Sequence, residues 1–211
     1  MSGIAGIISL CESTIDTTKI DVLKNNIKYR AQDGFQQYSN KNCNLIYAKL
    51  NTTEQCACDM QPIFDNDINA VIVSNSRIDN RDELIRTLNI PHNLTDCEII
   101  LAGYKKWKEK VVDHLIGPFS FVIYDTKHKN IFLAVDHFAQ KPLYFSFNND
   151  EFIFSSDPRA ISFLDLNLYK VNHKKVIDYL IFQGCVDNES FYEHIKKLNK
   201  GQHAHIQQNR I

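Results

Sequence analysis

Short runs of β-branched and aromatic residues recur along the chain and constrain its fold more than any other feature. Runs rich in Ile, Val, Phe and Tyr predict strands over residues 4–10, 43–50, 68–74, 119–125, 130–135, 143–147 and 151–155. Polar turns at 126–129 and 148–150 join neighbouring runs into two hairpins. We therefore expect much of the chain to form antiparallel sheet.

Three amphipathic segments predict helices between these strands. Thr95 begins one that extends to Trp107, and Glu98 completes a capping box with it. Segments 80–88 and 174–182 also place apolar residues at helical spacing. In the second of these segments the apolar residues are Val176, Ile177, Leu180 and Ile181. Separate helices among antiparallel strands predict the α+β class rather than a wound parallel sheet.

Composition and patterning favour one water-soluble domain over residues 1–211. The chain has no internal repeat and no Pro/Gly/Ser-rich linker. Lys and Arg together number 24 against 25 Asp and Glu, so no net charge favours nucleic acid or an anionic membrane. The N-terminus lacks a basic region, and nowhere do apolar residues run long enough to span a bilayer. We expect a cytoplasmic protein with neither nucleic-acid nor membrane partners.

Glycine, cysteine and histidine positions argue against a nucleotide or metal site. None of the 7 glycines forms a phosphate-binding loop motif. Cys56 and Cys58 form the one tight cysteine pair, and no second pair at zinc spacing accompanies it. His203 and His205 alternate on a predicted strand with no carboxylate or thiol nearby in the sequence, which favours an ordinary strand face over metal ligation. The chain is expected to bind no metal and no cofactor.

The N-terminus could carry chemistry, because Ser2 follows Met1 and leads directly into the first predicted strand. Removal of Met1 would leave an α-amine, whose ordinary pKa is about 8, next to the Ser2 hydroxyl. One residue would then supply both a nucleophile and its general base. Since Met-Ser starts are also common for reasons of processing alone, this feature by itself decides nothing.

Short motifs follow one another in order along the chain. They are MSGIAGI at Met1, RAQD at Arg30, YAKL at Tyr47, QP at Gln61, NSRIDNRDEL at Asn75, TDCE at Thr95, LIGPFSF at Leu115, DHFAQKPLY at Asp136, FSSD at Phe154 and IKKLNKG at Ile195. In order and spacing they resemble class II glutamine amidotransferases, the N-terminal-nucleophile glutaminases, and specifically the asparagine synthetase family. The RIDNRDEL part is nearer to the form found in lasso-peptide cyclases and β-lactam synthetases.

This resemblance implies a fold and a reaction. The fold is a four-layer αββα sandwich of two antiparallel sheets, the Ntn-hydrolase fold, with residue 2 at the open end of a cleft. In the family a residue-2 thiol attacks the γ-amide of glutamine, and the released ammonia travels to an ATP-dependent synthetase domain that activates a carboxylate. The pyrophosphate-binding S-G-G-x-D-S loop of that second domain is absent here, so ATP and Mg²⁺ are expected only in a synthetase domain outside this chain.

The resemblance also implies roles for individual residues. Ser2 matches the nucleophile, while the Asn75 side chain and the Ser76 backbone N–H match the oxyanion hole, whose donors stabilise charge on the attacked carbonyl. Asp96 matches the carboxylate that holds the α-amine of glutamine, and Lys49 matches the arginine that holds its α-carboxylate.

Three further residues complete the substrate-binding set that the resemblance implies. Arg30 and Asp33 lie in the segment that matches the family's R-G-P-D turn, and Arg77 adjoins the oxyanion hole.

Several of these positions depart from the family pattern. A serine hydroxyl is a far weaker acid than a thiol of pKa about 8.5, and Lys49 lacks the two-point grip of arginine. Ser76 replaces a glycine that the substrate approaches closely, and Arg77 replaces a glutamate. Ala31 and Gln32 replace the Gly-Pro of the turn. The departures predict weak or lost glutamine hydrolysis in a domain kept as the N-terminal half of an amide-forming ligase.

Two alternatives remain open on the sequence. The chain could be an active amidotransferase that releases ammonia with Ser2 as nucleophile. It could instead be a non-catalytic module that binds a synthetase subunit or an acidic peptide through Lys49, Arg77 and Arg81. Expected partners are glutamine or a similar small molecule, a synthetase domain or subunit, and a second copy of the chain in a homodimer.

Overall fold

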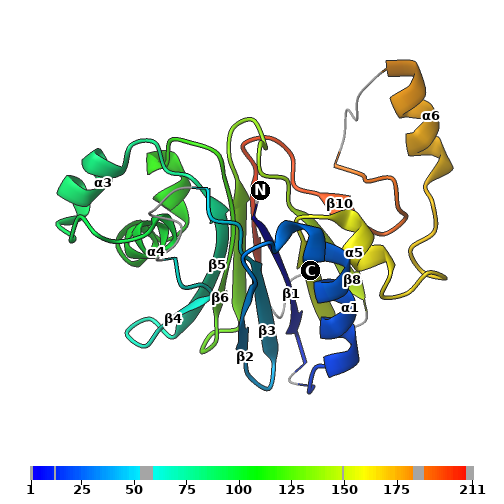
Figure 1. Ribbon diagram of the computed structural model, residues 1–211, viewed down its shortest axis with the longest axis horizontal. Coiled ribbons are helices and arrows are strands. Elements are labelled where there is room, and N and C mark those ends of the chain that lie inside the picture. The colour runs from blue at the N-terminus through cyan, green and yellow to red at the C-terminus, as the bar shows by residue number, and fades with distance from the viewer. Residues whose placement is uncertain (1, 12, 53–58, 149, 183–187, 208–211) are drawn as a thin grey trace.

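The computed structural model describes residues 2–11, 13–52, 59–148, 150–182 and 188–207. Two antiparallel sheets lie face to face, and helices cover the outer face of each (Figure 1). The chain therefore has the predicted four-layer αββα architecture. The Cys56 and Cys58 pair lies outside the described residues.

The strands follow the predicted runs closely, and short additional strands extend each sheet. In the described part of the chain the first sheet has the order β10-β8-β9-β1-β3-β2 and the second β11-β7-β6-β5-β4. The first sheet contains β1 (Gly3–Ser9), β2 (Phe35–Ser39), β3 (Cys43–Ala48), β8 (Tyr144–Asn148), β9 (Glu151–Ser155) and β10 (Lys196–Lys197). The second contains β4 (Ile63–Asp65), β5 (Ala70–Ser76), β6 (Phe119–Asp125), β7 (Asn130–Val135) and β11 (His203–Ile206).

In the part of the chain that the structure describes, four α-helices cover the outer faces of the two sheets. Helices α1 (Thr17–Ile27) and α5 (Pro158–Ser162) pack on the first sheet, and α3 (Arg81–Leu88) and α4 (Asp96–Trp107) cover the second (Figure 1). Short 3-10 segments, Lys28–Arg30 and Lys108–His114, follow α1 and α4. The predicted capping box at Thr95 is present.

Helix α1 was not among the helices that the sequence predicts. Its buried residues are Ile20, Leu23 and Ile27, a 3-4 spacing typical of one helix face. The helix begins after Asp16, whose carboxylate accepts a hydrogen bond of 2.9 Å from the Thr18 N–H. Both signals are visible in the sequence, but the polar residues between them obscure the apolar face.

Three apolar cores separate the four layers. The central core lies between the sheets and contains Ile4 and Phe154 from the first sheet and Val73 and Val122 from the second. The second core joins the β4–β7 sheet to α3 and α4, and the third joins the first sheet to α1 and α5. Because side chains alternate along a strand, β1 contributes to two cores at once, and every residue from Gly3 to Ser9 is buried.

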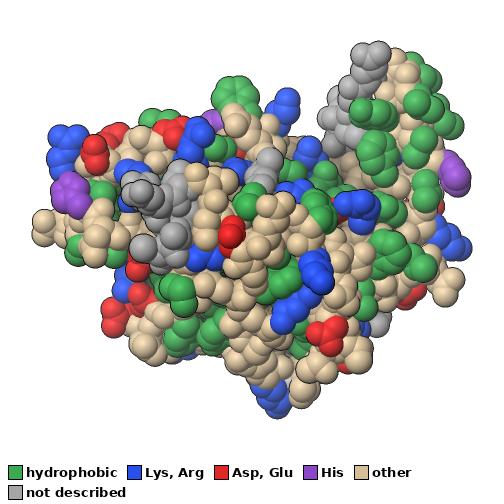
Figure 2. Space-filling model, in the orientation of Figure 1, with side chains coloured by type: hydrophobic (Ala, Val, Ile, Leu, Met, Phe, Trp, Pro, Cys, Tyr) green, Lys and Arg blue, Asp and Glu red, His purple; other side chains and the backbone are tan. Residues whose placement is uncertain are grey.

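Helix α6 (His173–Phe182) forms where predicted, but its apolar side chains are not covered by the described part of the chain. Ile177, Leu180 and Ile181 are 55%, 74% and 66% exposed. The helix extends away from the sandwich, and its apolar side chains are visible on the surface (Figures 1 and 2). Its buried side chain is instead Lys175, which pairs with Asp178 and Glu189.

The structure places a carboxylate beside one of the two histidines of β11, which the sequence did not predict. The Nδ1 atom of His205 lies 3.3 Å from Oε1 of Glu109, which is distant in sequence. His203 instead contacts the ring of Phe132. Within the described ranges, no three His, Cys, Asp or Glu side chains gather closely enough to hold a metal ion. Nor does any described helix have the length and apolar character needed to cross a membrane.

Thiol labelling should separate the described cysteines by burial. Cys43 and Cys97 are buried, and burial raises the pKa of both thiols, whereas Cys11 is exposed. Because the thiolate is the reactive form, we expect Cys43 and Cys97 to react at least about a thousandfold more slowly than Cys11, through transient unfolding. Peptide mass spectrometry after timed alkylation measures this ratio. Equal rates for these two thiols in native protein and in urea would contradict the burial of Cys43 in the central core and of Cys97 beneath α3 and α4.

Candidate active site

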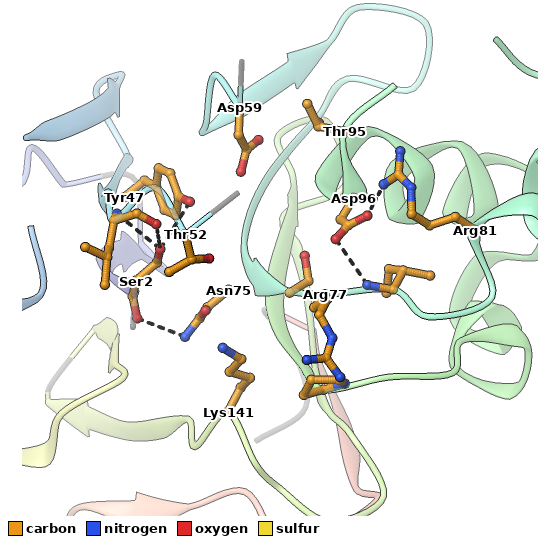
Figure 3. Close-up of a pocket in the computed structure, with 14 residues that line it drawn as sticks. Ser2, Tyr47, Thr52, Asp59, Asn75, Arg77, Arg81, Thr95, Asp96 and Lys141 are labelled. Carbon is orange, nitrogen blue, oxygen red and sulfur yellow. Dashed lines mark hydrogen bonds and ion pairs between the residues drawn. The ribbon is translucent and has the colours of Figure 1, made fainter. Parts of the chain in front are cut away.

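Strand β1 carries Ser2 to the edge of a cavity of about 460 Å³ that lies where the two sheets meet the start of α4 (Figure 3). The strand is paired on both sides, with β3 and with β9, so its path is fixed. Gly6 allows this close packing, because a Cβ there would lie 2.7 Å from both the Asn44 carbonyl oxygen and the Phe154 ring. The N-terminal residue is therefore positioned by the central core.

The Ser2 hydroxyl is held by the segment that follows β3. Its Oγ donates a hydrogen bond of 3.2 Å to the Leu50 carbonyl and accepts one of 3.2 Å from the Leu50 N–H. The Tyr47 hydroxyl also donates to Ser2 Oγ at 3.4 Å. A main-chain carbonyl accepts a hydrogen bond but does not remove the proton, so these contacts orient the hydroxyl without activating it.

The two residues matched to the oxyanion hole lie beside Ser2, at the end of β5. The Nδ2 of Asn75 donates a hydrogen bond of 3.0 Å to the Ser2 carbonyl oxygen and so connects the two sheets (Figure 3). Ser76 lines the same cavity, with its Oγ 3.0 Å from that of Ser74. The structure therefore brings Ser2, Asn75 and Ser76 together, as the resemblance implies.

Asp96 also lines the cavity, but both of its carboxylate oxygens already have partners. Arg81 forms an ion pair with Oδ1 and also donates to the Leu94 carbonyl at 2.6 Å, while the Ile78 N–H donates to Oδ2 at 3.1 Å (Figure 3). Burial raises the pKa of the Asp96 carboxyl, and the bonds from Ile78 and Arg81 offset part of that effect.

Arg77 and Lys141 add positive charge to the cavity wall. Arg77 forms two hydrogen bonds with Asp79, of 2.9 and 3.2 Å, and its side chain is 69% exposed. Lys141 follows a loop organised by the buried Asp136, whose carboxylate accepts hydrogen bonds from several backbone N–H groups, including that of Lys141 at 3.3 Å. Ala139 in this loop has φ of 50°, where the family motif has glycine.

Three of the predicted substrate-binding residues do not line this cavity. Lys49 is 8% exposed, and its Nζ donates to the Asp59 carbonyl at 3.2 Å. Arg30 packs against Gly3 and donates to the Tyr29 hydroxyl at 2.9 Å. Asp33 accepts a hydrogen bond of 2.7 Å from the Asn51 N–H. All three stabilise the segments around Ser2, and their proposed contact with substrate remains a prediction.

Asp59 is a cavity residue that sequence reasoning missed. Its Oδ2 accepts a hydrogen bond of 2.6 Å from Gln61 Nε2, and the other side of that buried amide accepts the Ser74 N–H at 2.7 Å. Burial raises the pKa of the Asp59 carboxyl, and hydrogen bonds from Gln61 and Tyr47 offset only part of the rise. The neighbouring Gln61-Pro62 motif was the one available signal, because Asp59 itself follows an uninformative polar stretch.

Comparison with known protein families gives a match over the whole chain. The glutamine amidotransferase domain model matches residues 1–211. A maize glutamine-hydrolysing asparagine synthetase is 31% identical over 166 residues, which are 77% of this chain and 28% of that protein. A Bacillus subtilis glutamine-hydrolysing asparagine synthetase is 27% identical over 98% of this chain and 29% of its own length. The chain thus spans less than a third of these relatives.

Solved structures show the same fold at low sequence identity. Glutamine phosphoribosylpyrophosphate amidotransferase from B. subtilis aligns over 76% of this chain and 43% of its own, with a TM-score of 0.61 and 15% identity. An allosteric regulatory enzyme of purine biosynthesis aligns over 97% of this chain and 47% of its own, with a TM-score of 0.66 and 15% identity. Together with the whole-chain match, these results place the chain in the family of glutamine amidotransferase domains.

Proposed function

We propose that this domain is the amidotransferase half of an asparagine-synthetase-type, amide-forming ligase and that its own hydrolysis of glutamine is weak or lost. The homology to glutamine-hydrolysing asparagine synthetases supports the first part. ATP and Mg²⁺ would then act in the synthetase domain or subunit with which this domain pairs.

The occupied Asp96 carboxylate is the observation that carries the second part. A glutamine α-ammonium needs a carboxylate acceptor, and the residue matched to that role already accepts from Arg81 and from the Ile78 N–H. To bind, the substrate would have to displace an ion pair whose side chains are each 21% exposed. Exchange of one cation for another at the same carboxylate yields little net free energy.

The neighbouring positions act in the same direction. The glutamate of the family motif is replaced by Arg77, which places a second cation near the expected ammonium. The Lys49 ammonium, matched to the α-carboxylate, is covered by the Asp59 carbonyl. Glutamine would therefore be held poorly at both ends of its amino-acid moiety, and poor positioning of the amide lowers the rate of attack.

A glutaminase assay tests this proposal directly. We expect the processed protein to release glutamate from glutamine at less than about ten times the rate of a Ser2→Ala variant, because neither a strong nucleophile nor a substrate anchor is available. Mass spectrometry should first establish that Met1 has been removed. Turnover at an ordinary enzymatic rate of about 1 per second or more, abolished by Ser2→Ala, would contradict the proposal and favour an active amidotransferase.

A further inference from the structure

We propose that the cavity binds a small ω-amino acid, with the ammonium group on Asp59 and the carboxylate at the opposite end, near Lys141 and Asn75. This inference rests on the proposed function, because such a ligand has no amide for Ser2 to attack.

One carboxylate oxygen of Asp59 lacks a hydrogen-bond donor among the described residues. Oδ1 of Asp59 is buried and accepts no hydrogen bond from any residue that the structure describes, whereas Oδ2 is held by Gln61. A buried charged oxygen left without a donor is unfavourable, and a ligand ammonium would supply one. Asp59 lies on the wall of the cavity, on the side away from Lys141 (Figure 3).

The two carboxylates of the described cavity wall differ in whether they can accept a hydrogen bond from a ligand ammonium. Asp96 is the other acidic residue on the described cavity wall, and both of its oxygens have partners. Lys49, which matches a carboxylate-binding arginine, lies behind the Asp59 main chain and does not line the cavity. The cavity wall therefore presents the Asp59 carboxylate close to the place where the resemblance implies the cation at position 49. An ammonium is favoured there and the α-carboxylate of glutamine is not.

The end of the cavity away from Asp59 carries positive charge. Lys141 and Arg77 both line it, and Figure 3 shows the Lys141 side chain directed toward Asn75. The loop that carries Lys141 is fixed by the buried Asp136 carboxylate. A ligand carboxylate there would meet positive charge, whereas the neutral amide of glutamine would gain less. The cavity volume of about 460 Å³ is ample for a short linear zwitterion.

The test uses 5-aminovalerate as the probe, with calorimetric titration of the full chain at pH 7. Valerate lacks the ammonium and pentylamine lacks the carboxylate, so the two compounds separate the contributions of the two ends. We expect 5-aminovalerate to bind at least tenfold more tightly than either control compound. Binding of valerate or pentylamine with the affinity of 5-aminovalerate, or no saturable binding of 5-aminovalerate, would overturn the proposal.

Two substitutions assign the ends of the ligand. Asp59→Asn and Lys141→Met should each weaken 5-aminovalerate binding at least tenfold, and Lys141→Met should leave pentylamine binding unchanged. Asp67→Asn is the matched control, because the Asp67 side chain is 85% exposed and pairs with Lys105 outside the cavity. Affinity unchanged in both the Asp59 and the Lys141 variants would refute the assignment.

A stability measurement separates loss of the site from loss of the fold. Burial raises the pKa of Asp59, so its ionised form destabilises the folded protein at pH 7, and Asp59→Asn should raise the Tm while it abolishes binding. A merely structural role for Asp59 predicts the opposite change in Tm. The glutaminase assay tests the proposed function separately. Glutamine turnover that is abolished by Ser2→Ala would contradict that function, whatever the result of the 5-aminovalerate titration.

Discussion

Replacement of Gly117 by alanine is expected to lower the free energy of unfolding by about 4 kcal/mol, because backbone strain and steric overlap act together. Gly117 has φ of +128°, a conformation open to glycine alone, and a Cβ there would lie 2.2 Å from the Arg77 carbonyl oxygen. That neighbour is backbone and cannot rotate away. A loss of this size is a large part of the stability of an ordinary domain, and urea unfolding followed by circular dichroism measures it.

Gly34 provides the matched control for this experiment. It also has a positive φ, +101°, but a Cβ there would meet nothing within 4 Å. Gly34→Ala should therefore show the strain alone, about 1–2 kcal/mol, and the difference between the two variants reports the overlap with Arg77. Equal losses of unfolding free energy in the Gly34→Ala and Gly117→Ala variants would contradict the close approach of Gly117 to the Arg77 carbonyl.

A shift of the Gly117 segment would also affect the cavity, because this segment forms main-chain hydrogen bonds with Arg77 and Asp79. The Arg77 N–H donates to the Pro118 carbonyl at 2.9 Å, and the Asp79 N–H donates to the Ile116 carbonyl at 2.7 Å. A Gly117→Ala protein that still folds should therefore have altered ligand binding in the cavity.

The second large effect is a gain of glutaminase activity. Ser2→Cys alone should raise glutamate release less than tenfold, because Asp96, the residue matched to the ammonium acceptor of glutamine, is still occupied by Arg81. Addition of Arg77→Glu and Arg81→Gln places a carboxylate where the family has one and frees Asp96. We expect this triple variant to exceed Ser2→Cys by about a hundredfold or more in kcat/KM. Steady-state glutamate assays compare the variants.

The fold should tolerate Arg77→Glu, whereas Arg81→Gln removes the partner of the largely buried Asp96 carboxylate and should lower the stability, so urea unfolding is measured for each variant. The Arg77 and Asp79 pair is exposed, with side-chain exposures of 69% and 46%, and such pairs contribute little. Arg77→Glu with Arg81→Gln in a Ser2→Ala background is the control, and it should release no glutamate. A Ser2→Cys variant as fast as the triple variant would show that the nucleophile alone limits the reaction and that the occupied Asp96 carboxylate does not.

Regular patterns made most of the fold predictable from the sequence. The buried strands β1, β3, β5, β6, β7 and β9 alternate or run continuously in Ile, Val and Phe, and the Thr95 capping box fixed the start of α4. Strands such as β2 and β4 were missed because they are short and less buried, so that their sequences carry little apolar signal. Helix α6 was predicted, but its periodicity could not show that the described residues leave its apolar face uncovered.

The motifs predicted which residues line the candidate site, but not the contacts that those residues make with other segments of the chain. Ser2, Asn75, Ser76, Arg77 and Asp96 converge on one cavity as the resemblance implies. Lys49 fails to line it because the Asp59 main chain covers its ammonium, a contact between segments that no motif encodes. Arg81 was proposed for an acidic ligand, but its partner is Asp96 of the same chain.

Strand β1 is buried along its whole length and paired on both sides, so the location of residue 2 does not depend on the reaction it performs. A lineage can therefore exchange the nucleophile by a single codon change without any cost to the scaffold. Loss of activity leaves the architecture intact, and a later reversal starts from a residue that is already in place. The fold of such a domain therefore does not by itself report whether the residue at this position is catalytic.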